Sequence, residues 1–348
     1  MTEVPRTRKE FFQSLNEKLT TQSADQFHFK AFWLEVNSKL HPTLAPRDGW
    51  EQVERGFYIW RQQGPESTEP VVVWMDTSSP RIWVAYSFGS RKQIEKVLRT
   101  TVLRQKGVDR VWLPEPFLEN LMKRNGYTDR GFRFSFIDSL AKPSVQKELP
   151  RFSAKFWIGD SPLPDAHQSF VSVASQTFTK SSLRMGRSPP DGEAGRSGLL
   201  LEVYSRGHMT VSSSDDPEEI QSLIGDIGET YAGSLGSLEA RRIDFPRVVD
   251  FKFHTKLNLR RFQEMIESGV GPTRLWMQKY DTDGDLQRYV GVDLHTNDDV
   301  GLDIAESYAY LTVARNGCMN AAPRLMTLSS SRLSSRTDMS FEGVPLFA

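Results

Sequence analysis

The segment between residues 199 and 231 constrains the fold of this chain more than any other. Two short apolar runs on either side of Arg206-Gly207 are typical of a β-hairpin. Asp216, Pro217 and Glu219 then stand at the cap, at the first helical position and three residues after the cap of a helix. This order predicts a hairpin that leads directly into an amphipathic helix.

The N-terminal part is expected to combine helices with a second hairpin. Residues 8–40 place apolar side chains at helical spacing, and the runs 71–75 and 81–86 flank a turn signal. Ser90 is expected to cap the helix that follows. The sequence therefore predicts an α+β protein, with an N-terminal α/β module followed by a two-repeat antiparallel sheet backed by helices.

The predicted domain boundaries follow the distribution of prolines and polar residues. Pro143 and Pro150 lie in a stretch that is typical of a linker. Residues 302–316 are expected to form the last helix of the second repeat. The predicted divisions are 1–140 for the N-terminal module, 141–151 for the linker, 152–330 for the two-repeat domain and 331–348 for a C-terminal tail.

Residues 152–231 and 247–316 are both expected to run strand, helix, hairpin, helix. Two tandem units of this order resemble the TATA-binding-protein type of fold, which has a saddle-shaped sheet. The resemblance is carried by Arg206–Val211 running into Asp216–Glu219, which look like that family's second hairpin strand and the helix after it. It implies a sheet that binds DNA or another nucleic acid. The same fold type also serves as a non-catalytic module, so the fold alone does not assign the function.

The charge balance excludes several broad classes of protein. The chain has 44 basic and 44 acidic residues, so no overall field attracts nucleic acid or an anionic membrane. Its apolar runs are shorter than the roughly 20 residues of a membrane helix. The first residues contain no apolar core of a signal peptide. We therefore expect no membrane association and a cytoplasmic location.

The motifs of common enzyme classes are missing. Cys318 is the only cysteine, which excludes an internal disulfide and a cysteine-cluster zinc site. We expect it to be a buried structural thiol, because no base can be assigned to it from the sequence. Residues 281–285 have the acidic spacing of a calcium loop, but the glycine and glutamate of an EF-hand are absent, so a hairpin turn is predicted. No metal or cofactor is expected, and a non-enzymatic role is favoured.

A group of basic residues is the main candidate for a binding site. It is interleaved with Phe245, Phe251 and Phe253, which suits phosphate contact combined with base stacking. The predicted nucleic-acid-binding residues are Arg241, Arg242, Arg247, Lys252, Lys256, Arg260 and Arg261. The alternative is a solvated surface with ordinary ion pairs, which the zero net charge supports.

A catalytic alternative rests on polar residues at alternating positions of one strand. Asp250, Lys252 and His254 share one face of the strand expected there. Asp250 and Lys252, with Glu202 from the other repeat, are the candidate catalytic residues of a divergent metal-dependent nuclease. A polar outer face of an antiparallel sheet explains the same pattern.

The leading prediction of function is a non-enzymatic nucleic-acid-binding or scaffold subunit of a larger cytosolic assembly, with other protein subunits as partners. The absence of a recognisable catalytic motif and the repeated architecture support it. A divergent metal-dependent nuclease and a purely protein-binding subunit are the two alternatives.

Overall fold

The computed structural model places most of the chain. The described residues are 4–21, 29–62, 70–137, 151–157, 169, 172–174, 178–187, 198–214, 216–240, 247–267, 273–315, 317–332 and 336–347. Among them, no helix is both long enough and apolar enough to cross a membrane. The predicted linker, 141–151, lies outside the described residues except for Arg151.

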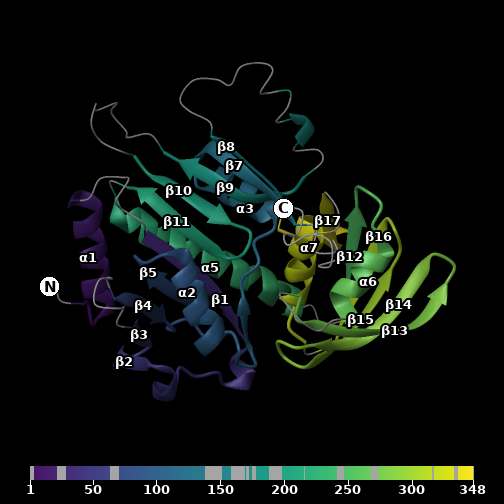
Figure 1. Ribbon diagram of the computed structural model, residues 1–348, viewed down its shortest axis with the longest axis horizontal. Helices are drawn as coiled ribbons and strands as arrows, with labels where there is room; N and C mark the ends of the chain where they lie inside the picture. The colour runs from purple at the N-terminus through teal and green to yellow at the C-terminus, as the bar shows by residue number, and fades with distance from the viewer. Residues whose placement is uncertain are drawn as a thin grey trace. The chain divides into compact units, whose positions relative to one another are not determined.

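The chain forms two compact units, each assembled from separated segments. Unit 1 contains Met1–Val111, Asn125–Thr128 and Arg184–Gly233, and unit 2 contains Trp112–Arg124, Asp129–Leu183 and Ser234–Ala348. The predicted domains, 1–140 and 152–330, are single stretches of chain, whereas each unit combines three stretches. Both units mix helices with antiparallel strands, so the predicted α+β class is confirmed (Figure 1).

Unit 1 is built around an antiparallel sheet. Its hydrogen-bonded strands follow the order β2-β3-β4-β5-β1-β11-β10, and β6 also pairs with β1. Its elements are α1 (Arg8–Thr21), β1 (Phe29–Val36), η1 (Ser38–Leu40), η2 (Pro46–Asp48), β2 (Trp50–Glu54), β3 (Phe57–Gln62), β4 (Val71–Asp76), β5 (Ile82–Ser87), α2 (Arg91–Val97), η3 (Leu98–Val102), β6 (Val108–Arg110), β10 (Leu200–Tyr204), β11 (His208–Ser213) and the first part of α5 (Pro217–Ala240). Strand β9 (Lys180–Gly186) contains residues of both units.

The helix predicted over 8–40 is wrong for its second half, which is strand β1. Every residue of β1 is buried, and the strand pairs with β5 on one side and β11 on the other. A strand that is buried on both faces has a continuous apolar sequence, which periodicity cannot separate from a buried helix. The predicted hairpin, β10–β11, pairs with β1 and so belongs to unit 1 rather than to a C-terminal domain beginning at residue 152.

Both predicted helix caps are confirmed. The Asp216 carboxylate accepts hydrogen bonds from the backbone N–H groups of Glu218 and Glu219, at 2.9 and 3.2 Å. Ser90 and Gln93 form a reciprocal capping box at the start of α2. Each cap satisfies amide groups that a first helical turn leaves without an intrahelical acceptor.

We expect Asp216→Ala to lower the free energy of unfolding by about 1 kcal/mol, because two amide groups lose their acceptor. Chemical denaturation followed by circular dichroism measures this change. Glu229→Ala, at an exposed position of the same helix, is the control and is expected to stay within about 0.5 kcal/mol of the wild type. Equal changes in the free energy of unfolding for the two substitutions would show that Asp216 does not stabilise the helix as its cap.

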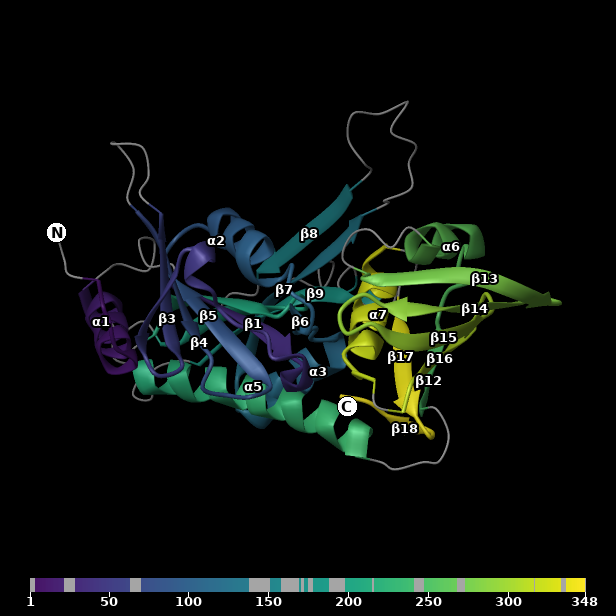
Figure 2. The same cartoon turned by 90° about the horizontal axis from the view of Figure 1, so that it is seen from below.

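Unit 2 contains the smaller of the two sheets, with the strand order β13-β14-β15-β16-β12-β17-β18. The elements of this unit are α3 (Glu115–Arg124), β7 (Thr128–Ile137), β8 (Arg151–Trp157), the last part of α5, β12 (Arg247–Phe253), α6 (Leu259–Glu267), β13 (Leu275–Asp283), β14 (Leu286–Asp293), β15 (Asp298–Ile304), β16 (Tyr308–Val313), α7 (Ala321–Arg332), β17 (Thr337–Phe341) and β18 (Val344–Pro345). Residue Thr128 of β7 is assigned to unit 1. Figure 2 shows the strands of the smaller sheet together with α6 and α7.

The helix predicted over 302–316 is wrong, because these residues form the end of β15 and the whole of β16. Buried residues alternate with more exposed ones along β16, which is the period of a strand. The predicted tail, 331–348, is also corrected, because β17 pairs with β12 inside the sheet.

Apart from α6, which has no counterpart helix between β1 and β2, a similar order of elements occurs once in each unit. In unit 1, β1 is followed by the meander β2–β5, by α2 and by β6, and β1 pairs with both β5 and β6. In unit 2, β12 is followed by α6, by the meander β13–β16, by α7 and by β17, and β12 pairs with both β16 and β17. The internal repeat therefore spans 29–110 and 247–341, not the predicted 152–231 and 247–316. The resemblance to the TATA-binding-protein type of fold stays a prediction.

Candidate functional site

The smaller sheet, in unit 2, has two different faces. One face carries apolar residues such as Phe251, Leu302 and Leu311, which are all at most 2% exposed. Helix α6 packs against β13, and its apolar residues are buried there with Leu275 and Met277. The other face carries the residues at the intervening positions of the strands, and we call it the open face.

Two tyrosines lie side by side on the open face. Tyr308 and Tyr310 of β16 are 38% and 41% exposed, and their ring centroids are 5.3 Å apart. In the register of the sheet, Tyr308 stands opposite Lys252 of β12, and Tyr310 stands opposite Asp250. The pleat puts opposite residues on the same face, so these four side chains form one cluster.

This cluster forms part of the wall of a cavity of about 1060 Å³ in unit 2. Helix α3 supplies Glu119 and Lys123 to the wall, and the chain after β17 supplies Pro345 and Leu346. The ring of Phe117 on α3 lies 6.0 Å from that of Phe347, so these two walls contact each other. The cavity is as large as those that hold cofactors or several ligand groups.

Some of the charged side chains in the cavity wall have an ion-pair partner and others do not. Among the described residues, neither Lys123 nor Lys252 has an ion-pair partner. Two of the carboxylates are paired: Glu119 with Lys180, at 2.5 Å, and Asp338 with His254, at 2.7 Å. Two lysines and two exposed aromatic rings in one cavity wall favour a ligand that combines negative charge with a flat apolar group.

Asp250 is the remaining carboxylate next to the tyrosines. Burial raises the pKa of Asp250 above its ordinary value. The cause is partial removal from water, which disfavours the charged form of a carboxylate.

The structure divides the predicted basic cluster. Arg241 and Arg242 lie outside the described residues, and so does the side chain of Arg247, whose backbone begins β12. Of the remaining four, Lys252 lies on the open face. The other three lie elsewhere: Lys256 pairs with Glu306 at 2.9 Å, Arg260 pairs with Glu264 at 3.4 Å, and Arg261 is on α6.

Tyr308, Tyr310 and Lys123 were not predicted from the sequence as parts of one site. The two tyrosines alternate with buried residues, which is a strand signal, but the helix predicted over 302–316 hid it. Lys123 is distant in sequence, and only the packing of α3 brings it to the cavity.

The residues of the predicted nuclease site do not all lie in one unit. Asp250 and Lys252 share the open face, as predicted, whereas Glu202 lies on β10 of unit 1. The hairpin predicted at the acidic segment 281–285 is confirmed, although residues 281–283 are the paired end of β13 and only 284–285 form the turn. Arg288 binds the Asp281 carboxylate there at 2.8 Å.

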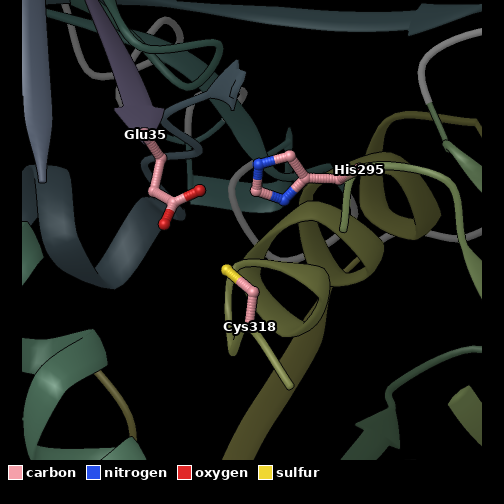
Figure 3. Close-up of side chains that lie close together, drawn as sticks. All are labelled: Glu35, His295 and Cys318. Atoms are coloured by element: carbon pink, nitrogen blue, oxygen red, sulfur yellow. The ribbon is translucent and has the colours of Figure 1, made fainter. Parts of the chain in front are cut away.

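A second group of reactive side chains lies inside unit 2. Cys318 is buried, as predicted, but His295 is buried beside it, and the thiol sulfur and an imidazole nitrogen lie within 4.8 Å. Figure 3 shows these two side chains turned toward one another. Glu35, also drawn in Figure 3, belongs to β1 of unit 1, where its carboxylate binds Arg81 at 3.0 Å.

Comparison with known proteins assigns the chain to a family. The family model of the MJECL33-like proteins matches residues 9–342. The protein MJECL33 of Methanocaldococcus jannaschii is 20% identical over 380 aligned positions, which cover 93% of this chain and 88% of that protein. No solved structure matches the chain. Because the family model matches nearly the whole sequence, the chain belongs to the MJECL33-like protein family.

Proposed function

We propose that this protein is a non-enzymatic subunit of a larger cytosolic assembly and that it binds single-stranded nucleic acid through the open face. The observation that carries the proposal is the cavity whose wall contains Tyr308, Tyr310, Lys252 and Lys123. Exposed aromatic rings stack on unpaired bases, and lysines without a carboxylate partner can neutralise phosphates.

The arrangement favours single strands over duplexes. Bases in a duplex are already stacked on their neighbours, so their faces are not available to a tyrosine ring, whereas an unpaired base can stack on any aromatic platform. Two lysine–phosphate contacts predict a weak dependence on salt. The slope of log affinity against log salt concentration is expected to be about −1.4, from about 0.7 for each contact with a single strand.

The binding test uses fluorescence anisotropy with labelled oligo-dT and oligo-U at low salt. The Tyr308→Ala/Tyr310→Ala variant is expected to bind at least about fivefold more weakly, because stacking contributes about 1–3 kcal/mol for each base. The matched control is Tyr280→Ala, which removes an exposed tyrosine near the end of β13 and should leave affinity unchanged.

A second pair of variants tests the lysines. Lys252→Gln is expected to lower affinity and to reduce the salt slope by about 0.7. Lys256→Gln is the matched control, because Lys256 is already paired with Glu306. The proposal fails if neither oligonucleotide binds at low salt, or if the cavity variants and their controls change binding equally.

The same assay addresses the nuclease alternative. Oligonucleotides incubated with Mg²⁺ or Mn²⁺ are expected to stay intact. Cleavage that requires the metal and disappears in Asp250→Asn, while the variant stays folded, would replace the non-enzymatic proposal with a nuclease.

A protein-binding scaffold is the second candidate, and other exposed residues of the open face favour it. Trp276 of β13 and Val290 of β14 are exposed on this face, away from the cavity. Exposed aromatic residues with apolar neighbours are typical of the centre of protein interfaces. A protein that co-purifies from the native host with the wild type and the tyrosine variant, but not with Trp276→Ser, would support the scaffold.

A further inference from the structure

His295 and Cys318 belong to two connections of unit 2 that converge. His295 lies in the turn between β14 and β15, and Cys318 lies in the segment between β16 and α7. They are 0% and 4% exposed. Imidazole nitrogen and cysteine sulfur are both ligands that zinc prefers in proteins.

The separation of the two side chains suits a shared metal ion. Zinc binds sulfur at about 2.3 Å and histidine nitrogen at about 2.0–2.1 Å, so two ligands of one tetrahedral ion lie roughly 3.5 Å apart. The sulfur of Cys318 and a ring nitrogen of His295 lie within 4.8 Å of one another, which is close to the separation that a shared ion requires.

A buried carboxylate, Asp293, and a half-buried one, Asp298, hold the backbone on both sides of this pair. The Asp298 carboxylate accepts hydrogen bonds from the Cys318 N–H, at 3.0 Å, and from the Thr296 hydroxyl. The Asp293 carboxylate accepts a hydrogen bond from the His295 N–H, also at 3.0 Å. Asp298 therefore links the turn that carries His295 to the segment that carries Cys318, as outer-shell groups do in metal sites.

Zinc binds the thiolate form of cysteine, and two backbone features lie next to the Cys318 sulfur. The backbone N–H of Asn320 donates to the Cys318 sulfur, at 3.5 Å. Helix α7 begins at Ala321, so its positive end is near the same sulfur.

We propose that His295 and Cys318 provide two ligands to a zinc ion, with water or other oxygen donors at its remaining positions. The ion would connect the β14–β15 turn to the start of α7. This proposal is independent of nucleic-acid binding, because it involves none of the cavity residues.

The test uses the 348-residue chain, reduced and freed of metal with a chelator, and titrated with Co²⁺ as a spectroscopic substitute for zinc. We expect a thiolate-to-cobalt charge-transfer band in the near ultraviolet, with one equivalent bound and displaced by Zn²⁺. Because Cys318 is the only thiol, the band reports on this site alone. A folded wild type that gives no such band would overturn the proposal.

Substitutions then test whether His295 and Cys318, and not other side chains, bind the metal. Cys318→Ser is expected to abolish the band, and His295→Gln to weaken cobalt binding at least tenfold. His254→Gln is the matched control, because His254 is a histidine exposed beside Asp338, and it should leave the band unchanged. Asp298→Asn should weaken binding by about 10- to 100-fold through loss of positioning. A band that His295→Gln leaves at full affinity would also overturn the proposal.

Discussion

Replacing Arg324 with methionine is expected to destabilise the protein by about 3–5 kcal/mol. The Arg324 guanidinium binds the Asp293 carboxylate at 2.7 Å, and the two side chains are 0% and 1% exposed. The substitution keeps most of the apolar volume but leaves the carboxylate buried without its cation. Urea denaturation monitored by tryptophan fluorescence measures the loss.

The control for this prediction is the same substitution in an exposed ion pair. Arg260 pairs with Glu264 on the surface of α6, so Arg260→Met is expected to cost at most about 0.5 kcal/mol. Adding Asp293→Leu to Arg324→Met should restore part of the lost stability, because no unpaired buried charge is left. If Arg324→Met and Arg260→Met lower the free energy of unfolding by the same amount, burial does not govern the strength of the Arg324–Asp293 ion pair.

Gly207→Ala is expected to be the second severe substitution, with a loss of about 3 kcal/mol or more. Gly207 is in the turn between β10 and β11 at a φ of +65°, where a side chain costs about 1–2 kcal/mol. An added Cβ would also lie 2.2 Å from the carbonyl oxygen of Val111, so the backbone itself would have to move.

Gly126→Ala separates these two contributions. Gly126 has the same φ of +65°, but nothing lies within 4 Å of the position of its Cβ. We therefore expect only the conformational cost, about 1–2 kcal/mol, in thermal or urea unfolding. Equal losses in the two variants would show that the turn at Gly207 moves away from Val111 without strain.

The fold is only partly predictable from local signals, and the four-strand meander of unit 2 shows why. The turn of the β13–β14 hairpin was predicted because its residues are adjacent in sequence. The pairing of β12 with β16 and β17 joins residues about sixty or ninety positions apart, and only close packing selects such partners. The wrong assignment of 302–316 as helix followed from judging that segment without its neighbours.

The candidate sites depend even more on long-range packing. Lys252 was singled out from its sequence neighbours, but the residues that matter beside it are Tyr308 across the strand pair and Lys123 on α3. Likewise, no base could be assigned to Cys318 from the sequence, because His295 reaches it only through the convergence of two connections between strands and helices.

By itself, the sequence determined the α+β class, the hairpin of β10 and β11, and the caps at Ser90 and Asp216. These features depend on turn residues and hydrogen bonds between residues a few positions apart, so the local sequence contains the information. Only the tertiary structure decided that β1 is a strand, that the repeat spans 29–110 and 247–341, and which side chains share a site. Burial on both faces of a strand and pairing between distant segments are properties of the packed molecule, and no local pattern encodes them.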